Sequence, residues 1–89
     1  MTLNAAVITN TTSGTWSATA TWGGGVVPGA GDDVIISNGS TVTLDANYNC
    51  LSLTINAGVN NSTLDLNGFT FSVTNTITIN APTVNNNVK

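Results

Sequence analysis

The sequence predicts an all-β fold, a short right-handed parallel β-solenoid (β-helix) with an N-terminal Trp/Gly-rich cap. Apolar and polar residues alternate in short segments, which is typical of half-buried strands, and no segment has a helical period. Two of these segments recur at fixed offsets, as expected for the stacked turns of one coil. A glycine- and proline-rich segment, residues 23–31, separates a tryptophan-containing lead-in from the alternating part.

Composition restricts the class of protein. The 89 residues suffice for one domain at most, and the single cysteine, Cys50, excludes an internal disulfide. The only basic residue is Lys89, so the chain lacks the cations that bind nucleic acid or anionic membranes. No apolar run reaches the length of about 18 residues that membrane insertion requires. With no histidine and one cysteine, we expect no zinc or haem site and no cofactor.

The N-terminal part predicts lead-in strands followed by a cap. Val7 and Ile8 belong to a short apolar run that is compatible with a strand. Residues 15–22 alternate strictly, so we expect a strand with Trp16 and Trp22 on one face. There the two rings would pack as a hydrophobic plug over the first turn of the coil. A platform for stacking against a sugar is the alternative role for them.

From residue 34 onward, alternation continues through six short segments. Strands are expected at 34–37, 41–45, 51–56, 62–67, 69–73 and 76–80. Their buried residues are expected to include Val42, Leu44, Leu53, Ile55, Leu64, Leu66, Phe71, Ile77 and Ile79. The chain is therefore predicted to be a single domain, 1–89, with lead-in strands and cap loop at 1–33, β-solenoid rungs at 34–80 and a polar tail at 81–89.

An internal repeat favours the solenoid. Residues 40–45 align with 62–67 at an offset of 22, and residues 53–56 align with 77–80 at an offset of 24. Offsets of this size, with several short strands in each repeat, indicate turns that stack through parallel pairing.

An antiparallel β-sandwich is the alternative fold. It would place hairpins at Asn38-Gly39 and Asn67-Gly68, because Asn-Gly is a strong signal for a two-residue hairpin. The short strands and the asparagines near the expected corners of a coil favour the solenoid over this alternative.

Residues 16–56 also carry a resemblance. The string WSATATWGGGVVPGAGDDVIISNGSTVTLD, followed by CLSLTI, resembles the opening segment of bacterial extracellular right-handed β-helix proteins. These are adhesin-like surface proteins, often exported by the type IX route, in which this segment caps the helix and Thr/Asn-rich turns follow. The resemblance implies a location outside the cell or on the cell surface of a bacterium.

Asp32 and Asp33 form the only pair of adjacent carboxylates. With Gly29-Ala30-Gly31 they match most of the calcium-binding nonapeptide pattern, which makes them weak calcium candidates. One copy cannot complete the coordination shell that tandem copies provide, so we expect no metal site. The favoured interpretation is that a short acidic side chain accepts backbone N–H bonds at a turn. We find no catalytic constellation and expect no enzyme.

Four threonines define a possible ligand face. Thr41 and Thr43, and likewise Thr76 and Thr78, are two residues apart, so each pair points outward from its expected strand. Ice becomes a plausible ligand only if three or more such pairs stack on one flat face. Threonine is also an ordinary strand residue, so the pattern alone does not require a ligand.

Two functions from different classes follow. The first is a structural subunit that self-assembles into an extracellular fibre, with Ile77 and Ile79 at one end meeting the strand of Val7 and Ile8 at the other. Solenoids need caps, and exposed strand edges pair with other strands. The second is the capping and binding module of a surface adhesin, with carbohydrate or ice as ligand. The partner is accordingly another copy of the chain or the rest of a larger surface protein.

Overall fold

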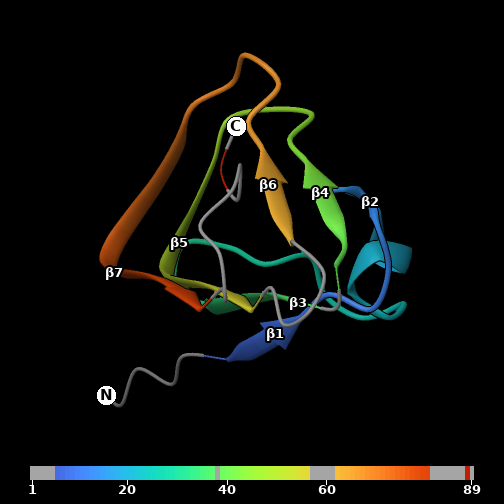
Figure 1. Ribbon diagram of the computed structural model, residues 1–89, viewed down its shortest axis with the longest axis horizontal. Helices are drawn as coiled ribbons and strands as arrows, with labels where there is room; N and C mark the ends of the chain where they lie inside the picture. The colour runs from blue at the N-terminus through green and yellow to red at the C-terminus, as the bar shows by residue number, and fades with distance from the viewer. Residues whose placement is uncertain (1–5, 38, 57–61, 81–87, 89) are drawn as a thin grey trace.

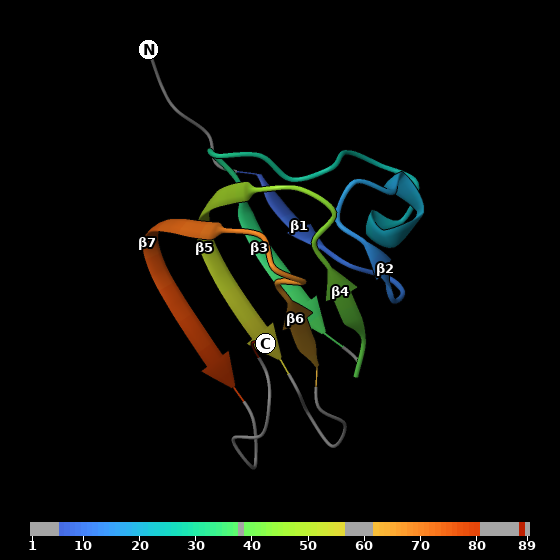
Figure 2. The same cartoon turned by 90° about the horizontal axis from the view of Figure 1, so that it is seen from above.

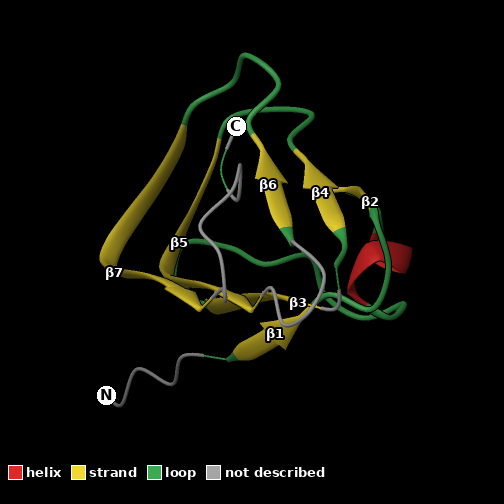
Figure 3. Ribbon diagram, in the orientation of Figure 1, coloured by secondary structure: helices red, strands yellow, loops and turns green. Residues whose placement is uncertain are grey.

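The computed structural model describes residues 6–37, 39–56, 62–80 and 88. Within these residues the chain forms seven β-strands and one short 3₁₀ helix, η1 (Figure 3). Their bounds are β1 Val7–Thr9, β2 Gly14–Thr15, η1 Thr19–Trp22, β3 Asp33–Ser37, β4 Thr41–Thr43, β5 Tyr48–Asn56, β6 Thr63–Asp65 and β7 Phe71–Asn80. The fold is all-β, as predicted.

The strands form two parallel sheets. The four-stranded sheet has the order β1-β3-β5-β7, and the three-stranded sheet has the order β2-β4-β6. Consecutive strands of the two sheets make one layer: β1 with β2, β3 with β4, and β5 with β6, after which β7 begins the fourth layer. All pairs of these strands are parallel, so the antiparallel sandwich is wrong. Asn38, in one of its two hairpins, lies outside the described residues.

The path of the chain has a three-sided outline (Figure 1). The ribbons of β5 and β7 bend and follow two of the sides, and their pairing shifts register between Cys50 and Ser52. The strands β4 and β6 lie along the third side. Figure 2 shows the layers side by side, with β7 at one end of the stack and η1 at the other.

Residues that the sequence repeat aligns are residues that pair between neighbouring strands. Val42 pairs with Leu64 and Leu53 pairs with Ile77, which are the offsets of 22 and 24 that the alignment predicted. Val88 forms a parallel bridge with Leu64, so this residue of the predicted polar tail returns to the three-stranded sheet. The other tail residues lie outside the described part of the chain.

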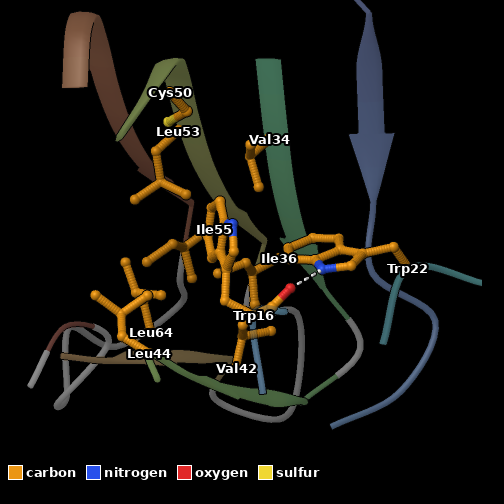
Figure 4. Packing of buried hydrophobic residues seen from close by; sticks show 10 residues of the cluster. All are labelled: Trp16, Trp22, Val34, Ile36, Val42, Leu44, Cys50, Leu53, Ile55 and Leu64. Carbon is orange, nitrogen blue, oxygen red and sulfur yellow. Dashed lines mark hydrogen bonds between the residues drawn. The ribbon is translucent and has the colours of Figure 1, made fainter. Parts of the chain in front are cut away.

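The hydrophobic core lies between the two sheets (Figure 4). Its buried members are Trp16, Trp22, Val34, Ile36, Val42, Leu44, Cys50, Leu53, Ile55 and Leu64. Leu66 and Phe71, also predicted as core, are partly buried against it. Ile77 and Ile79 are 56% and 40% exposed, so the prediction that they are buried is wrong. Both lie on β7, the last strand of its sheet, which has a neighbouring strand on one side only among the described residues.

The strand predicted over residues 15–22 is also wrong, because the chain leaves β2 after Thr15 and forms η1. The Thr21 hydroxyl donates to the Thr15 carbonyl at 2.8 Å, which draws the segment into a compact turn. Gly23 ends η1 at φ 76°, with its N–H on the Ala20 carbonyl at 3.2 Å. Glycine adopts this left-handed conformation without steric cost.

Candidate functional site

Two columns of inward-facing residues cross the four-stranded sheet. The first column is Ile8, Val34, Leu53 and Ile77, and the second is Asn10, Ile36, Ile55 and Ile79. In the two middle layers these side chains are at most 1% exposed. At β7 the same columns end in residues that are 56% and 40% exposed. The change in burial marks β7 as the open end of the stack.

The outer edge of β7 is the first candidate site. This strand is 10 residues long, and one of its edges is bonded to β5. Its other edge has no strand partner among the residues that the structure describes. A long strand edge beside exposed apolar side chains is a template for pairing with another strand. The edge is therefore a candidate surface for pairing with another strand.

The fully buried Trp16 lies at the centre of an aromatic cluster whose other rings come from η1, β5 and β7. Its ring meets the Trp22 ring edge-on at 5.0 Å, stacks on Tyr48 at 5.3 Å and meets Phe71 at 5.2 Å. The Trp22 indole N–H donates to the Trp16 carbonyl at 2.7 Å (Figure 4), and that of Trp16 donates to the Pro28 carbonyl at 3.2 Å. Since both indole rings are buried, neither presents a face on which a sugar could stack.

A close approach at Gly14 of β2 shows how tightly the first layer is packed. A Cβ atom at this position would lie closer to the hydroxyl oxygen of Thr21 than real Cβ contacts allow. Thr21 is only 1% exposed, and its hydroxyl is held by the Thr15 carbonyl. The first layer therefore has no room for a side chain at Gly14.

A buried asparagine begins the second inward column. Asn10 is 2% exposed and lies beside Ile36, at a position that is isoleucine in every later layer. Its side-chain amide donates to the Thr12 carbonyl at 3.0 Å, and its side-chain oxygen accepts the Ser37 N–H at 2.8 Å. Because both ends of the amide are bonded, its burial costs little.

Asp45 ties the segment before η1 to the start of β5. Its carboxylate accepts the hydroxyl and the N–H of Ser17, and also the Tyr48 hydroxyl at 2.9 Å. These bonds, with that of the Ser17 hydroxyl contributing most, lower the pKa of Asp45. Partial burial and the neighbouring carboxylate raise the pKa of Tyr48. At neutral pH the tyrosine therefore stays protonated and donates to an ionised aspartate.

The acidic pair considered for calcium has a local contact of its own. The Asp32 carboxylate accepts the N–H of Gly29 at 2.8 Å, which is the turn contact expected of a short acidic side chain. Asp33 is the first residue of β3. Among the described residues, no group of three or more Asp, Glu, His or Cys side chains is placed to hold a metal ion.

The four threonines considered as a ligand face are not brought together. Thr41 and Thr43 lie on β4 in the three-stranded sheet, whereas Thr76 and Thr78 lie on β7 in the four-stranded sheet. The T-x-T spacing correctly indicates which residues share one side of a strand, but it does not indicate to which of the two sheets that strand belongs. No single flat threonine face combines these pairs.

The lone cysteine belongs to the core. Cys50 is fully buried, and its thiol contacts the Ser52 carbonyl at 3.4 Å. Burial, together with the charges of Asp33 and Asp32, raises the pKa of this thiol to about 11. The thiolate is the nucleophilic form of cysteine, so a thiol in this position is unreactive at neutral pH.

A pocket of about 370 Å³ is the second candidate site. It is lined by Pro28, Gly29, Asn47, Tyr48, Asn49, Thr70 and Ser72. Sequence reasoning missed it, because its lining comes from three separate stretches and none of them has a charge cluster or a known motif. The only signal was that polar residues recur just before or at the start of β5 and β7.

Comparison with protein families gives one match, to the G8 domain over residues 21–84. This span contains β3 to β7 and every residue that lines the pocket. No curated protein and no solved structure matches the chain. G8 domains are found in extracellular proteins, and no helix among the described residues is long and apolar enough to cross a membrane. Since the match covers most of the sequence, the chain belongs to the G8 domain family.

Proposed function

We propose that this G8 chain is a non-enzymatic structural protein, a right-handed β-solenoid subunit that self-assembles end to end into a fibre at a bacterial surface. The observation that carries the proposal is the exposure of Ile77 and Ile79, in columns that are at most 1% exposed in the middle layers. Each layer corresponds to one turn of the coil, and parallel crossover connections are right-handed in nearly all proteins.

The occupant of the β7 edge is β1 of a second copy. These two strands end the four-stranded sheet on opposite sides, so a parallel contact between them continues the sheet across the boundary between copies. The column positions set the register: Ile77 meets Ile8 of the next copy, and Thr76 meets Val7. Because the two ends differ, the contact is heterologous, and such a contact produces a filament when it does not close into a ring.

The energetics favour association at moderate concentration. Covering the exposed parts of Ile77 and Ile79 contributes on the order of 2 kcal/mol in total. New backbone hydrogen bonds along the strand edge add to this, at about 0.5–1.5 kcal/mol each. The net charge of −3 and the single basic residue leave little repulsion between copies.

Negative-stain electron microscopy of the purified chain tests the proposal, and fibres are expected. The double variant Ile77→Lys/Ile79→Lys places charge at the open end and should abolish them. The control variant Thr41→Lys/Ala46→Lys adds the same charge at two exposed positions away from β7 and should keep them. A wild-type chain that stays monomeric and folded at high concentration would contradict the proposal and favour the adhesin module.

Cysteine cross-linking tests the register independently. In a Cys50→Ala background, Thr76→Cys with Val7→Cys places two thiols on directly opposed residues of neighbouring strands. Such residues lie about 4.8 Å apart, within the span of a disulfide. Two strands separate β1 from β7 in one chain, so a cross-link must join two copies. Thr76→Cys with Thr9→Cys is shifted by two residues and should not cross-link; equal yields from both pairs would refute the register.

A further inference from the structure

We infer that the pocket lined by Pro28, Gly29, Asn47, Tyr48, Asn49, Thr70 and Ser72 binds an uncharged saccharide. This inference goes beyond the proposed fibre and does not depend on it. None of these residues belongs to the contact between Ile77, Ile79 and β1. The pocket would therefore be present both in a single chain and in an assembled one.

The pocket spans three consecutive layers at equivalent places. Pro28 and Gly29 lie in the loop before β3, Asn47 and Asn49 flank the start of β5, and Ser72 lies at the start of β7. Asn49 and Ser72 are directly paired across β5 and β7. A ligand in this pocket would contact residues of successive layers, so the site forms only when these layers stack on one another.

The loop side of the pocket is held rigidly. The carbonyl of Pro28 accepts the Trp16 indole N–H at 3.2 Å, and the N–H of Gly29 is bonded to the Asp32 carboxylate at 2.8 Å. Pro28 itself is buried. These contacts fix the loop against the core before any ligand arrives, which reduces the entropy that binding must overcome.

The strand side of the pocket is equally fixed. The Tyr48 ring stacks on Trp16 at 5.3 Å, and its hydroxyl is held by Asp45 at 2.9 Å. The Asn47 side-chain oxygen accepts the N–H of Thr70 at 2.8 Å, which joins the second and third polar stretches. The orientation of the tyrosine ring is therefore set by the protein and not by a ligand.

The lining selects a neutral, polyhydroxylated ligand. It consists of amides, hydroxyls, one aromatic ring, one proline and one glycine, with no charged side chain. A sugar ring combines apolar C–H groups, which contact an aromatic side chain, with hydroxyls that exchange hydrogen bonds with amides and hydroxyls. The pocket's 370 Å³ lies near the lower end of the ~300–1,000 Å³ typical of small-molecule sites, enough for about one or two sugar rings.

Charge argues against anionic ligands. The chain has net charge −3, and none of the residues that the structure describes carries a basic side chain that could bind a phosphate, sulfate or uronate group. Asp32 and Asp45, which hold the two sides of the pocket, add negative charge close to it. A neutral sugar avoids this repulsion, whereas a sulfated sugar does not.

Isothermal titration calorimetry tests the inference with chitotetraose, cellotetraose and maltotetraose as neutral probes and a heparin disaccharide as the anionic probe. We expect saturable binding of at least one neutral probe and none of the heparin disaccharide. Amide chemical shifts, measured on the Ile77→Lys/Ile79→Lys variant if the wild type assembles, should change at Gly29, Asn49 and Ser72. No binding of any neutral probe, binding of the anionic probe alone, or shifts confined to other residues would overturn the inference.

Paired alanine variants localise the site. Asn49→Ala/Ser72→Ala removes two exposed polar side chains of the lining and should weaken binding about tenfold, as expected for the loss of two hydrogen bonds. The control Thr74→Ala/Asn75→Ala changes two exposed residues of β7 outside the lining and should leave the affinity unchanged. Circular dichroism establishes that both variants are folded. Equal affinities of the two variants would also overturn the inference.

Discussion

Trp16, between β2 and η1, is fully buried against aromatic rings of η1, β5 and β7, whereas Ile77, on the last strand of the four-stranded sheet, leaves 56% of its surface exposed. A stack of parallel strands has an outermost layer at each end, and the apolar side chains of that layer must be covered. At the N-terminal end, the 3₁₀ helix η1 with its buried Trp22 and the hydrogen-bonded Asn10 cover the first layer. Among the described residues, the β7 end has no equivalent cover.

The difference teaches that two separate conditions decide burial in a layered β protein. Alternation along a strand decides which face a side chain joins, and Leu53 and Ile77 join the same face. Burial also requires a neighbouring layer on each side. Leu53 has both neighbours and is 1% exposed, whereas in the part of the chain that the structure describes Ile77 has a neighbouring strand on one side only. Three experiments test how far the two ends differ.

The largest expected effect is that of Trp16→Ala. Truncating a fully buried tryptophan should lower the free energy of unfolding by about 3–5 kcal/mol, which is a large part of the stability of a small domain. Ile77→Ala removes a half-exposed side chain and should cost about 1 kcal/mol or less. Urea unfolding at low protein concentration measures both. Comparable losses would show that Ile77 is covered as well as Trp16.

A smaller effect is expected from Gly14→Ala, which forces a methyl group onto the Thr21 hydroxyl. Overpacking of this kind should lower the free energy of unfolding by about 1–3 kcal/mol. Thr21→Ala relieves the clash but loses a hydrogen bond, so the double variant should be less destabilised than the sum of the single variants. Gly31→Ala is the control, since its Cβ atom would meet nothing within 4 Å. Simple additivity would mean that the end layer adjusts freely.

The smallest expected effect concerns the pH dependence set by Asp45. Its pKa is lowered in the folded chain, so its stabilising contribution is complete above the unfolded pKa of about 3.9 and is lost as the pH falls through the folded value. Ser17→Ala removes the largest cause, and Asp45→Asn removes the titration itself. Thermal unfolding between neutral and acidic pH should show a shallower loss of Tm with falling pH in both variants. An unchanged acid profile would exclude this contact as a source of stability.

Much of the layered arrangement could be predicted from the sequence, because residues that pair in successive layers recur at a nearly constant spacing along the chain. The residues that pair across β4 and β6, such as Val42 and Leu64, are those that the 22-residue offset aligned. The core residues of the middle layers follow from alternation for the same reason: Leu53 and Ile55 have neighbours on both sides. Periodicity is most informative where each layer repeats the surroundings of the one before.

The end layer could not be predicted in this way. Residues 15–22 alternate as strictly as any strand, but the Thr21 hydroxyl bond and the left-handed Gly23 bring them into η1 instead. These are tertiary and turn contacts, which a two-residue period in the sequence does not reveal. The pocket escaped prediction for a related reason: Gly29, Asn49 and Ser72 meet only through the stacking of layers and share no local pattern.

Asn10 has a mechanical consequence for the proposed fibre. Its amide lies in a column whose other members are Ile36, Ile55 and Ile79. Each subunit of the fibre would therefore place one polar side chain in a column that is otherwise aliphatic. Both polar groups of this amide already have a partner within their own chain, Thr12 and Ser37, so neither needs a hydrogen bond from a neighbouring copy. The boundary between subunits is thus the plane of lowest cohesion. Under tension such a fibre parts between intact subunits, and its broken ends can rejoin.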